Sequence, residues 1–179
     1  MMLKKILVAN RGEIALRILR ACKELNIKTV VVHSTADEKE MFVRLADESV
    51  CIGPPHVKSS YLNIPSIISA ATIANADGIH PGIGMLAENS SFAKIVNDHG
   101  FTFIGPKPEH IDKMANKIKA KALAKKIGLP VIPGSEKNIE NYKDAKLTAS
   151  SIGYPIIIKS TNGGGGRGIK IVEEEKHLK

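Results

Sequence analysis

The chain has 179 residues, of which 43% are hydrophobic and 25% are charged, and its formal net charge is +8. This balance excludes a disordered chain, because enough apolar residues are present to fill a core. No run approaches the ~18 uninterrupted apolar residues of a membrane helix, and we expect neither a secretory signal nor a membrane partner. Cys22 and Cys51 lie within apolar patterns, so we expect two buried thiols in a reducing cytosol rather than a disulfide or a zinc site.

Most of the excess positive charge lies in one segment, residues 107–126, where seven lysines accompany Glu109 and Asp112. Such a run is compatible with a nucleic-acid-binding face or with a solvated helix surface. Aromatic residues make up only 4% of the chain, and none lies between Phe103 and Tyr142, which disfavours a platform for stacking bases. We therefore expect a solvated helix and no nucleic-acid partner.

Strand and helix patterns alternate over the first hundred residues. Buried strands are expected at residues 6–9, 29–33, 50–52, 78–80 and 101–104, and amphipathic helices at 13–25, 64–74 and 88–98. This alternation predicts an α/β fold with a Rossmann-like parallel sheet that carries helices on both faces. Ligands of such sheets bind at the carboxyl ends of the strands, which here are residues 10–13, 33–36 and 80–88.

A second region is expected to follow. Helices are predicted at about 108–114, 116–127 and 142–152, and strands at 156–159 and 169–172. The expected division is a sheet domain (1–106), a helical linker (107–134) and a second domain (135–179). The last two strands form a hairpin, and an isolated hairpin is marginal in water, so we expect this second domain to be incomplete within the sequence.

A glycine run, Gly163-Gly164-Gly165-Gly166-Arg167-Gly168, joins the two strands of the predicted hairpin. It contains G-x-G-x-x-G, but a dinucleotide-binding loop joins a strand to a helix, and the Gly-Lys-Ser/Thr ending of a Walker A loop is absent. Glycines at a hairpin tip instead suit a flap whose backbone N–H groups close over phosphates, and Lys159 is placed to reach the same phosphates. A flexible loop without a ligand is the alternative.

The segment Tyr154–Lys159 followed by NGGGGRG is similar to the glycine-rich loop of ATP-grasp carboxylases, and residues 5–15, KILVANRGEIA, resemble the opening of biotin carboxylases. Further motifs resemble that family in the same order: Leu45-Ala46-Asp47-Glu48, Ser60-Tyr61-Leu62-Asn63, His80-Pro81-Gly82, Leu86-Ala87-Glu88-Asn89 and Phe103-Ile104-Gly105-Pro106. Each motif alone is weak, but together they identify the chain as a member of the biotin carboxylase family, as its N-terminal portion. The resemblance implies a Rossmann-like (pre-ATP-grasp) domain followed by the beginning of an ATP-grasp domain.

The resemblance also implies an activity. Family members carboxylate biotin on a carrier protein with ATP and bicarbonate, and the acetyl-CoA carboxylase type is the expected context. ATP and Mg²⁺ are the implied cofactors, and a biotin carboxyl carrier protein and a carboxyltransferase are the implied partners, in the cytoplasm. In longer family members the metal ligands and the bicarbonate-holding base follow the glycine loop. No catalytic residue or metal ligand is therefore expected here, and the chain alone is expected to be inactive.

Particular residues match positions of known role in the family. Phosphate contacts are implied for Lys117, Lys159 and the backbone N–H groups of Gly163, Gly164, Gly165 and Gly166. The resemblance implies that Ile83 lies at the edge of the biotin pocket, at a position where the family usually has an aromatic residue. Arg20 and Glu24 match positions at the subunit interface of family dimers, and their spacing places them on one exposed helix face with Arg17.

Three alternatives differ in function. The chain could be a module that folds but catalyses nothing, or part of another ATP-grasp ligase, such as a carbamoyl-phosphate or purine-pathway enzyme, which shares the loop but not the opening Asn10-Arg11-Gly12-Glu13. A nicotinamide oxidoreductase is disfavoured because residues 9–16 lack the G-x-G-x-x-G spacing. The acidic triplet Glu173-Glu174-Glu175 is interpreted as a solvated charge run rather than a magnesium site.

Overall fold

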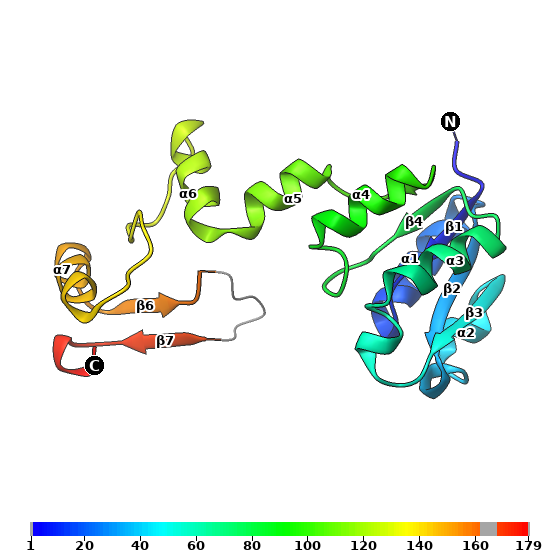
Figure 1. The fold of residues 1–179 in the computed structure, drawn as a ribbon, viewed down its shortest axis with the longest axis horizontal. Coiled ribbons are helices and arrows are strands. Elements are labelled where there is room, and N and C mark those ends of the chain that lie inside the picture. Colours follow the sequence, from blue (N-terminus) through cyan, green and yellow to red (C-terminus); the bar gives the residue numbers. More distant parts are fainter. Residues whose placement is uncertain (1, 162–167, 179) are drawn as a thin grey trace. The chain divides into compact units, whose positions relative to one another are not determined.

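The computed structural model describes residues 2–161 and 168–178, and these form two units that divide between Ile111 and Asp112 (Figure 1). Each unit has its own sheet and its own apolar core. The four glycines predicted to form the phosphate flap, Gly163 to Gly166, lie outside the described residues.

The first unit contains a parallel sheet whose strands follow the order β3-β2-β1-β4-β5. Its strands are β1 (Lys5–Val8), β2 (Lys28–Ser34), β3 (Glu48–Gly53), β4 (Gly78–His80) and β5 (Thr102–Phe103). β1 lies at the centre, where Ile6 is paired with Thr29 of β2 on one side and with Gly78 of β4 on the other. The predicted Rossmann-like sheet is confirmed, and the chain order reverses at β1.

Helices pack on both faces of this sheet, as predicted. They are α1 (Gly12–Glu24), α2 (Met41–Leu45), α3 (Ile64–Ile73) and α4 (Ser90–Asp98). Successive residues of β1 point to opposite faces. Ile6 packs in one cluster with Leu19 of α1, whereas Leu7 packs in the other with Ile67 of α3 and Phe92 of α4. Because both faces are buried, this strand has a continuous apolar sequence rather than an alternating one.

Two asparagine caps fix where α3 and α4 begin. Asn63 Oδ1 accepts a hydrogen bond from the N–H of Ser66 at 3.3 Å, and Asn89 Oδ1 accepts one from the N–H of Phe92 at 2.9 Å. Because Asn89 is the cap, α4 begins at Ser90, two residues after the predicted start. Three short elements of the first unit were not predicted: α2 and the 3₁₀ helices Thr35–Asp37 and Val57–Ser59.

The two cysteines lie in different environments. Cys22 on α1 is buried, and this burial raises the pKa of its thiol. Cys51 is exposed, so the prediction of two buried thiols is wrong for this residue. The reason is its position on β3, an edge strand with one face packed on the core, where Ile52 is buried and its neighbour Cys51 points to the other face.

The second unit contains mostly helix and one hairpin. Its elements are α6 (Lys117–Lys126), α7 (Tyr142–Ile152), β6 (Ile156–Lys159), β7 (Ile169–Val172) and the 3₁₀ helix Glu175–His177, while α5 (Pro108–Ala115) crosses the division. β6 and β7 pair antiparallel, with Ile156 opposite Val172, so the predicted hairpin is confirmed. No residue of α6 is buried, as expected for a solvated lysine-rich helix.

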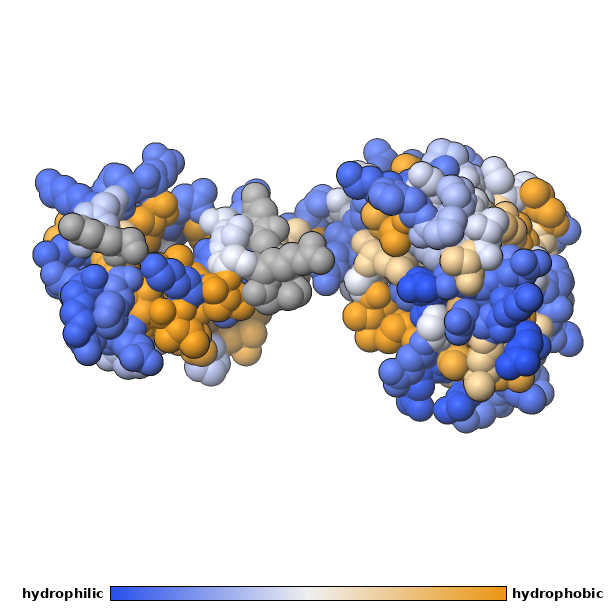
Figure 2. Space-filling view, turned by 90° about the horizontal axis from the view of Figure 1, so that it is seen from below, coloured by the Kyte–Doolittle hydropathy of each residue, from blue (hydrophilic) through white to orange (hydrophobic). Residues whose placement is uncertain are grey.

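The core of the second unit is small. Ala149, Val172 and Leu178 are its buried residues. By contrast, Ile157 and Ile171 of the hairpin are 57% and 64% exposed. Figure 2 shows hydrophobic surface among the hydrophilic residues of this unit. Across the parts of the chain that the structure describes, no helix has the length and apolar character needed to cross a bilayer.

Candidate functional site

Polar side chains gather where the strands of the parallel sheet end. Asn10 and Arg11 follow β1, Ser34 ends β2 with Asp37 just beyond it, and His80 ends β4. Because the strands are parallel, their carboxyl ends lie at one edge of the sheet, which is where open α/β sheets bind ligands. The predicted ligand-facing segments therefore share this edge.

Asp37 is the centre of a buried polar cluster at this edge. Its carboxylate accepts hydrogen bonds from Arg11 Nε at 2.9 Å, from the hydroxyl of Tyr61 at 2.6 Å and from that of Ser34 at 3.1 Å. A second guanidinium nitrogen of Arg11, Nη2, also donates to it. The hydrogen bond from Arg11 is the main cause that lowers the pKa of Asp37.

Two partners of Asp37, Tyr61 and Arg11, also contact each other. The Tyr61 side chain is buried, and this burial, together with the hydrogen bond to Asp37, raises the pKa of Tyr61 to about 12. The guanidinium carbon of Arg11 lies 5.7 Å from the centre of the Tyr61 ring, within the range of a cation–π contact. The Tyr61 hydroxyl serves as a donor to Asp37, and the cluster ties together residues that follow β1 and β2.

A short loop at residues 81–84, which bends at Ile83 and Gly84 and is called the turn below, follows β4 and carries Ile83. The side-chain amide of Asn10 donates to the carbonyl of Pro81 at 2.7 Å and to that of Ile83 at 3.0 Å. Nδ1 of His80 accepts the N–H of Gly82 at 3.0 Å, and burial lowers the pKa of this imidazole. The backbone of the turn is thus fixed, while the side chain of Ile83 is 72% exposed.

In the second unit, Lys117 lies close to the base of the glycine loop. Asn116 caps α6, since its Oδ1 accepts the N–H groups of Ile118 at 3.0 Å and Lys119 at 3.1 Å, and Lys117 is the first residue of that helix. Nζ of Lys117 donates to the carbonyl of Thr161 at 3.5 Å, a long bond. Thr161 comes two residues after Lys159, the last residue of β6. Two lysines predicted to contact phosphate therefore lie near one end of the hairpin.

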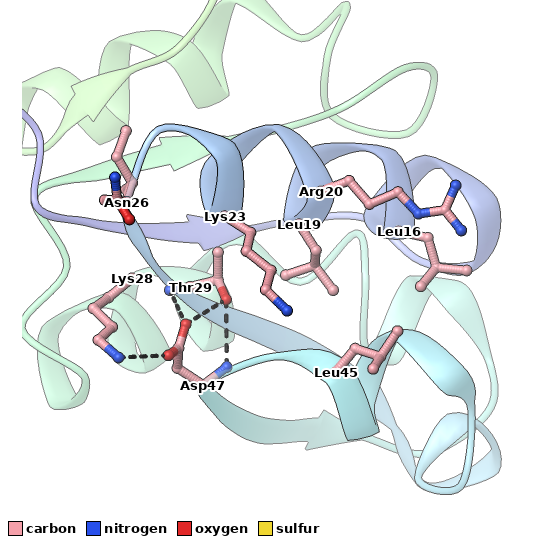
Figure 3. Close-up of a pocket in the computed structure, with 10 residues that line it drawn as sticks. Leu16, Leu19, Arg20, Lys23, Asn26, Lys28, Thr29, Leu45 and Asp47 are labelled. Atoms are coloured by element: carbon pink, nitrogen blue, oxygen red, sulfur yellow. Dashed lines mark hydrogen bonds and ion pairs between the residues drawn. The ribbon is translucent and has the colours of Figure 1, made fainter.

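A surface depression of about 650 Å³ lies beside Arg20 (Figure 3). It is lined by Leu16, Leu19, Arg20, Lys23, Asn26, Ile27, Lys28, Thr29, Leu45 and Asp47. Asp47 accepts hydrogen bonds from Lys28 Nζ at 2.8 Å and from both the N–H and the hydroxyl of Thr29 at 2.9 Å, which lower its pKa to about 2. These residues precede or begin β2 and β3, so the depression lies at the amino ends of the strands, away from the ligand-binding edge.

The exposed face of α1 agrees with its spacing. Arg17, Arg20 and Glu24 are all exposed, whereas Ile18 and Leu19 are buried. In Figure 3 Leu16, Leu19 and Lys23 project from α1 toward Leu45 and Asp47, and Arg20 lies at the rim. Within residues 2–161 and 168–178, no three His, Cys, Asp or Glu side chains are grouped so that they could hold a metal ion.

Comparison with known proteins supports this description. Residues 2–111 match the family described as biotin carboxylase, N-terminal domain, and residues 116–179 match the ATP-binding domain of the carbamoyl-phosphate synthase L chain. Fold and site together thus define a Rossmann-like domain joined to the start of an ATP-grasp domain. The chain belongs to the biotin carboxylase family.

Similar proteins include the biotin carboxylase of Pseudomonas aeruginosa, 56% identical over 99% of this chain and 40% of its own length. A pyruvate carboxylase subunit from Methanothermobacter thermautotrophicus is 50% identical over 99% of this chain and 36% of its own length. Among solved structures, the Campylobacter jejuni biotin carboxylase–β-γ-ATP complex has a TM-score of 0.93 and 50% identity, over 99% of this chain and 40% of that one. The chain thus spans about 40% of the length of the curated relatives it matches.

A further solved structure shows the biotin carboxylase domain dimer of the Hydrogenobacter thermophilus 2-oxoglutarate carboxylase, in complex with MgADP, ADP and bicarbonate. It has a TM-score of 0.92 and 44% identity, over 99% of this chain and 39% of that one. Relatives of this chain therefore include a crystallised dimer and one of the subunits of a pyruvate carboxylase.

The predicted site residues omitted the cluster around Asp37 and the amide of Asn10. Asp37 lies 26 residues from Arg11 and 24 from Tyr61, so sequence spacing gives no sign of the contact. A polar residue directly after a buried strand was the available signal for Asn10, because such a residue is placed at the ligand-binding edge of the sheet.

Proposed function

We propose that the chain is the N-terminal part of a biotin carboxylase, an ATP-dependent ligase that carboxylates carrier-bound biotin with bicarbonate. One observation carries the proposal: the biotin carboxylase match over residues 2–111 is followed in the same chain by the ATP-binding match over residues 116–179. Solved relatives named as complexes with ATP analogues, ADP and bicarbonate support the same substrates. A module without catalysis, or another ATP-grasp ligase, is not favoured by these matches.

In this function Lys117, Lys159 and the N–H groups of Gly163 to Gly166 bind the nucleotide phosphates. The position of Lys117 near Thr161, two residues beyond Lys159, supports a shared role for the two lysines. Each ammonium contact to a phosphate contributes about 1.5–3 kcal/mol, because a charge-assisted hydrogen bond is stronger than a neutral one. The lysines neutralise phosphate charge, and the glycine N–H groups act as donors that need no side chain.

Mg²⁺ accompanies ATP in this proposal, and among the described residues no three His, Cys, Asp or Glu side chains are grouped around a common point. We place its ligands, the bicarbonate base and the other catalytic residues outside this chain. A biotin carboxyl carrier protein and a carboxyltransferase of the acetyl-CoA carboxylase type are the proposed partners, in the cytoplasm. Residues 1–106, 107–134 and 135–179 are the proposed domain, linker and start of the ATP-grasp domain.

A chimaera tests the function. This chain replaces the matching residues of the Pseudomonas aeruginosa relative, and bicarbonate-dependent ATP hydrolysis and carboxylation of free biotin are measured. We expect both activities to survive, and Lys117→Gln or Lys159→Gln to raise the KM for ATP about 10- to 150-fold. Lys126→Gln, an exposed lysine on the same helix as Lys117, is the matched control and should change it less than about twofold. A folded but inactive chimaera, or equal effects of all three variants, contradicts the proposal.

Ile83 is the proposed edge of the biotin pocket. Its exposed side chain at the ligand-binding edge of the sheet supports this placement. An aromatic ring offers a broader contact, and tyrosine adds a hydroxyl group, so Ile83→Tyr in the chimaera should lower the KM for free biotin about 3- to 10-fold. The KM for ATP should stay nearly unchanged. An unchanged KM for biotin, or a change in the KM for ATP alone, would show that Ile83 does not line the biotin pocket.

Arg20 and Glu24 are proposed to lie in a homodimer interface. Arg20 lines the depression in Figure 3, whose lining residue Leu45 is 62% exposed, so a second subunit would cover apolar surface there. Sedimentation of the chimaera should give a dimer, and Arg20→Glu should weaken it, whereas Lys94→Glu on the exposed side of α4 should not. A monomer in all three cases would exclude the interface.

A further inference from the structure

We propose that Asn10 and His80 are positioning residues that hold the turn at residues 81–84 in its binding geometry before biotin arrives. The inference rests on the proposed function, because it assigns a role to the turn that carries Ile83. It goes further by naming two residues that need not touch biotin and yet set the affinity for it.

The position of Asn10 in the sheet is the first observation. The chain order reverses at β1, whose neighbours are β2 and β4, and ligands of open α/β sheets bind in the crevice at such a reversal. Asn10 follows β1, and the turn follows β4. The hydrogen bonds from Asn10 to the carbonyls of Pro81 and Ile83 therefore cross between the two strands at this crevice, joining residues more than 70 positions apart in the sequence.

The orientation of the Asn10 amide is fixed by its surroundings. Oδ1 accepts the N–H of Arg11 at 2.9 Å, while Nδ2 faces two carbonyl oxygens. A flipped amide would set oxygen against both carbonyls and nitrogen against an N–H. Asn10 is 3% exposed, so water cannot readily replace the lost bonds. The Arg11 side chain is held by its hydrogen bond to Asp37. The cluster around Asp37 thus keeps the Arg11 N–H in place to donate to Oδ1 of Asn10.

On its other side, the turn is held by a hydrogen bond to His80, and it leaves no room for a side chain at Gly82. Nδ1 of His80 accepts the N–H of Gly82 at 3.0 Å, which requires the tautomer protonated at Nε2. Gly82 has φ of +70°, and a Cβ at this position would lie 2.6 Å from Nδ2 of Asn10 and 2.7 Å from Cγ2 of Ile14. A side chain here would displace Asn10 from the turn, so the close approach requires glycine.

A fixed turn has a consequence for binding. Three hydrogen bonds hold the backbone around an exposed Ile83, so the protein does not have to order this segment when the ligand binds. Loosening the turn should weaken the binding of biotin and leave the binding of ATP and the chemical step nearly unchanged. A KM for biotin that rises while kcat and the KM for ATP stay constant is the expected signature.

Kinetics of the chimaera provide the first test. Asn10→Asp keeps the size and the oxygen that accepts from Arg11 but removes the donor, and His80→Phe removes the acceptor for Gly82. Each should raise the KM for free biotin about 3- to 10-fold, with less than about twofold change in the KM for ATP. The matched control is Asn63→Ala, which removes a helix cap outside the turn and should lower the melting temperature without changing the KM for biotin.

Amide exchange in the 179-residue chain provides the second test, which needs no activity. His80→Phe should speed exchange of the Gly82 N–H at least about tenfold, while the N–H of Ala9, bonded to the carbonyl of His80, keeps its protection. If an Asn10 variant fails to fold, Gly82→Ala serves in its place. Its methyl group should displace the Asn10 amide and shift the amide resonances of the turn. An inactive chimaera with the expected exchange contradicts the proposed function alone. Unchanged exchange, or equal changes in the KM values for biotin and ATP, overturns the positioning role.

Discussion

The central strand of the first unit and the first strand of the hairpin have similar sequences and opposite environments. In β1 Leu7 and Val8 are 0% exposed, whereas in β6 Ile157 and Ile158 are 57% and 40% exposed. β1 has a strand on each side and a helix layer on each face, but among the described residues β6 pairs only with β7. An apolar β-branched run thus specifies a strand, while its burial depends on neighbours contributed by distant parts of the chain.

The difference in burial implies a difference in stability. Burying a large aliphatic side chain contributes about 1.5–3 kcal/mol, and the first unit buries such residues on both faces of its sheet. The second unit has a three-residue buried cluster and exposes isoleucines of both hairpin strands. We therefore expect the two units to unfold separately, with the hairpin opening at a much lower free energy.

Hydrogen exchange gives the largest expected contrast. Amides of Leu7 and Ile79, in the centre of the parallel sheet, should exchange at least about 1,000-fold more slowly relative to their intrinsic rates than those of Ile157 and Ile171. The measurement is residue-resolved exchange by NMR on the 179-residue chain. Equal protection of the two sets would mean that the units unfold together, and the comparison would fail.

Truncating a core residue should destabilise the first unit strongly. Phe92 is 0% exposed, and its ring packs edge-on against that of Phe103 with the ring centroids 6.0 Å apart. Phe92→Ala should therefore lower the free energy of unfolding by about 3–5 kcal/mol. The matched change in the second unit is Leu147→Ala, which removes a side chain that is 62% exposed and should cost less than about 0.5 kcal/mol. Urea unfolding checks both values, and similar losses would contradict the assigned cores.

Ion pairs should differ between the units as well. Asp37 is 3% exposed, and Asp37→Asn weakens its bonds to Arg11 and Tyr61, which should cost about 2–3 kcal/mol at pH 7. Glu136→Gln removes the exposed pair with Lys125 and should leave the urea midpoint unchanged.

Because the folded-state pKa of Asp37 lies below its usual value of 3.8, its contribution to stability is present above pH 4 and is lost as the pH falls through the folded pKa. Asp37→Asn should therefore reduce the acid sensitivity of the first unit.

The smallest effect concerns His80. Its pKa is lowered by burial from the usual value of 6.5, so the unfolded chain binds a proton that the folded chain does not. Stability of the first unit is therefore complete above pH 6.5 and declines as the pH falls toward the folded pKa. Urea unfolding, followed at residues of β4 and of β6 from pH 8 to pH 5, checks this. The midpoint should fall with pH for the residues of β4 but not for those of β6. His80→Phe should flatten the curve, and an unchanged slope would contradict the assignment.

Much of the fold could be predicted from the sequence because its signals are local. Runs such as residues 29–33 specify strands, and the spacing of apolar residues on α1 specifies both its buried and its exposed face. Cys51 was misassigned because an apolar neighbourhood on an edge strand does not say which face a residue occupies. The order of the strands was not predicted, because it depends on which distant segments pair rather than on any single segment.

The candidate site was less predictable because its contacts are distant in sequence. Lys117 and Lys159 were identified by motif, and the structure places Lys117 near Thr161. The contacts of Asp37 with Tyr61, and of Asn10 with Pro81, join segments that meet only after the sheet has formed. A lone Asp or Asn has no local pattern that marks it as buried, so these residues required the structure.

The central place of β1 in the sheet also bears on how the chain folds during synthesis. Ile6 pairs with Gly78, and 72 residues separate them. A ribosome adds about 5–20 residues per second, so the first strand is made roughly 4–14 seconds before this neighbour exists. During that time one of its edges, with its N–H and C=O groups, has no partner strand, and such an edge is a template for wrong pairing. This edge of β1 closes only when β4 has been made, so the nascent chain carries an open strand edge until about residue 80 is synthesised.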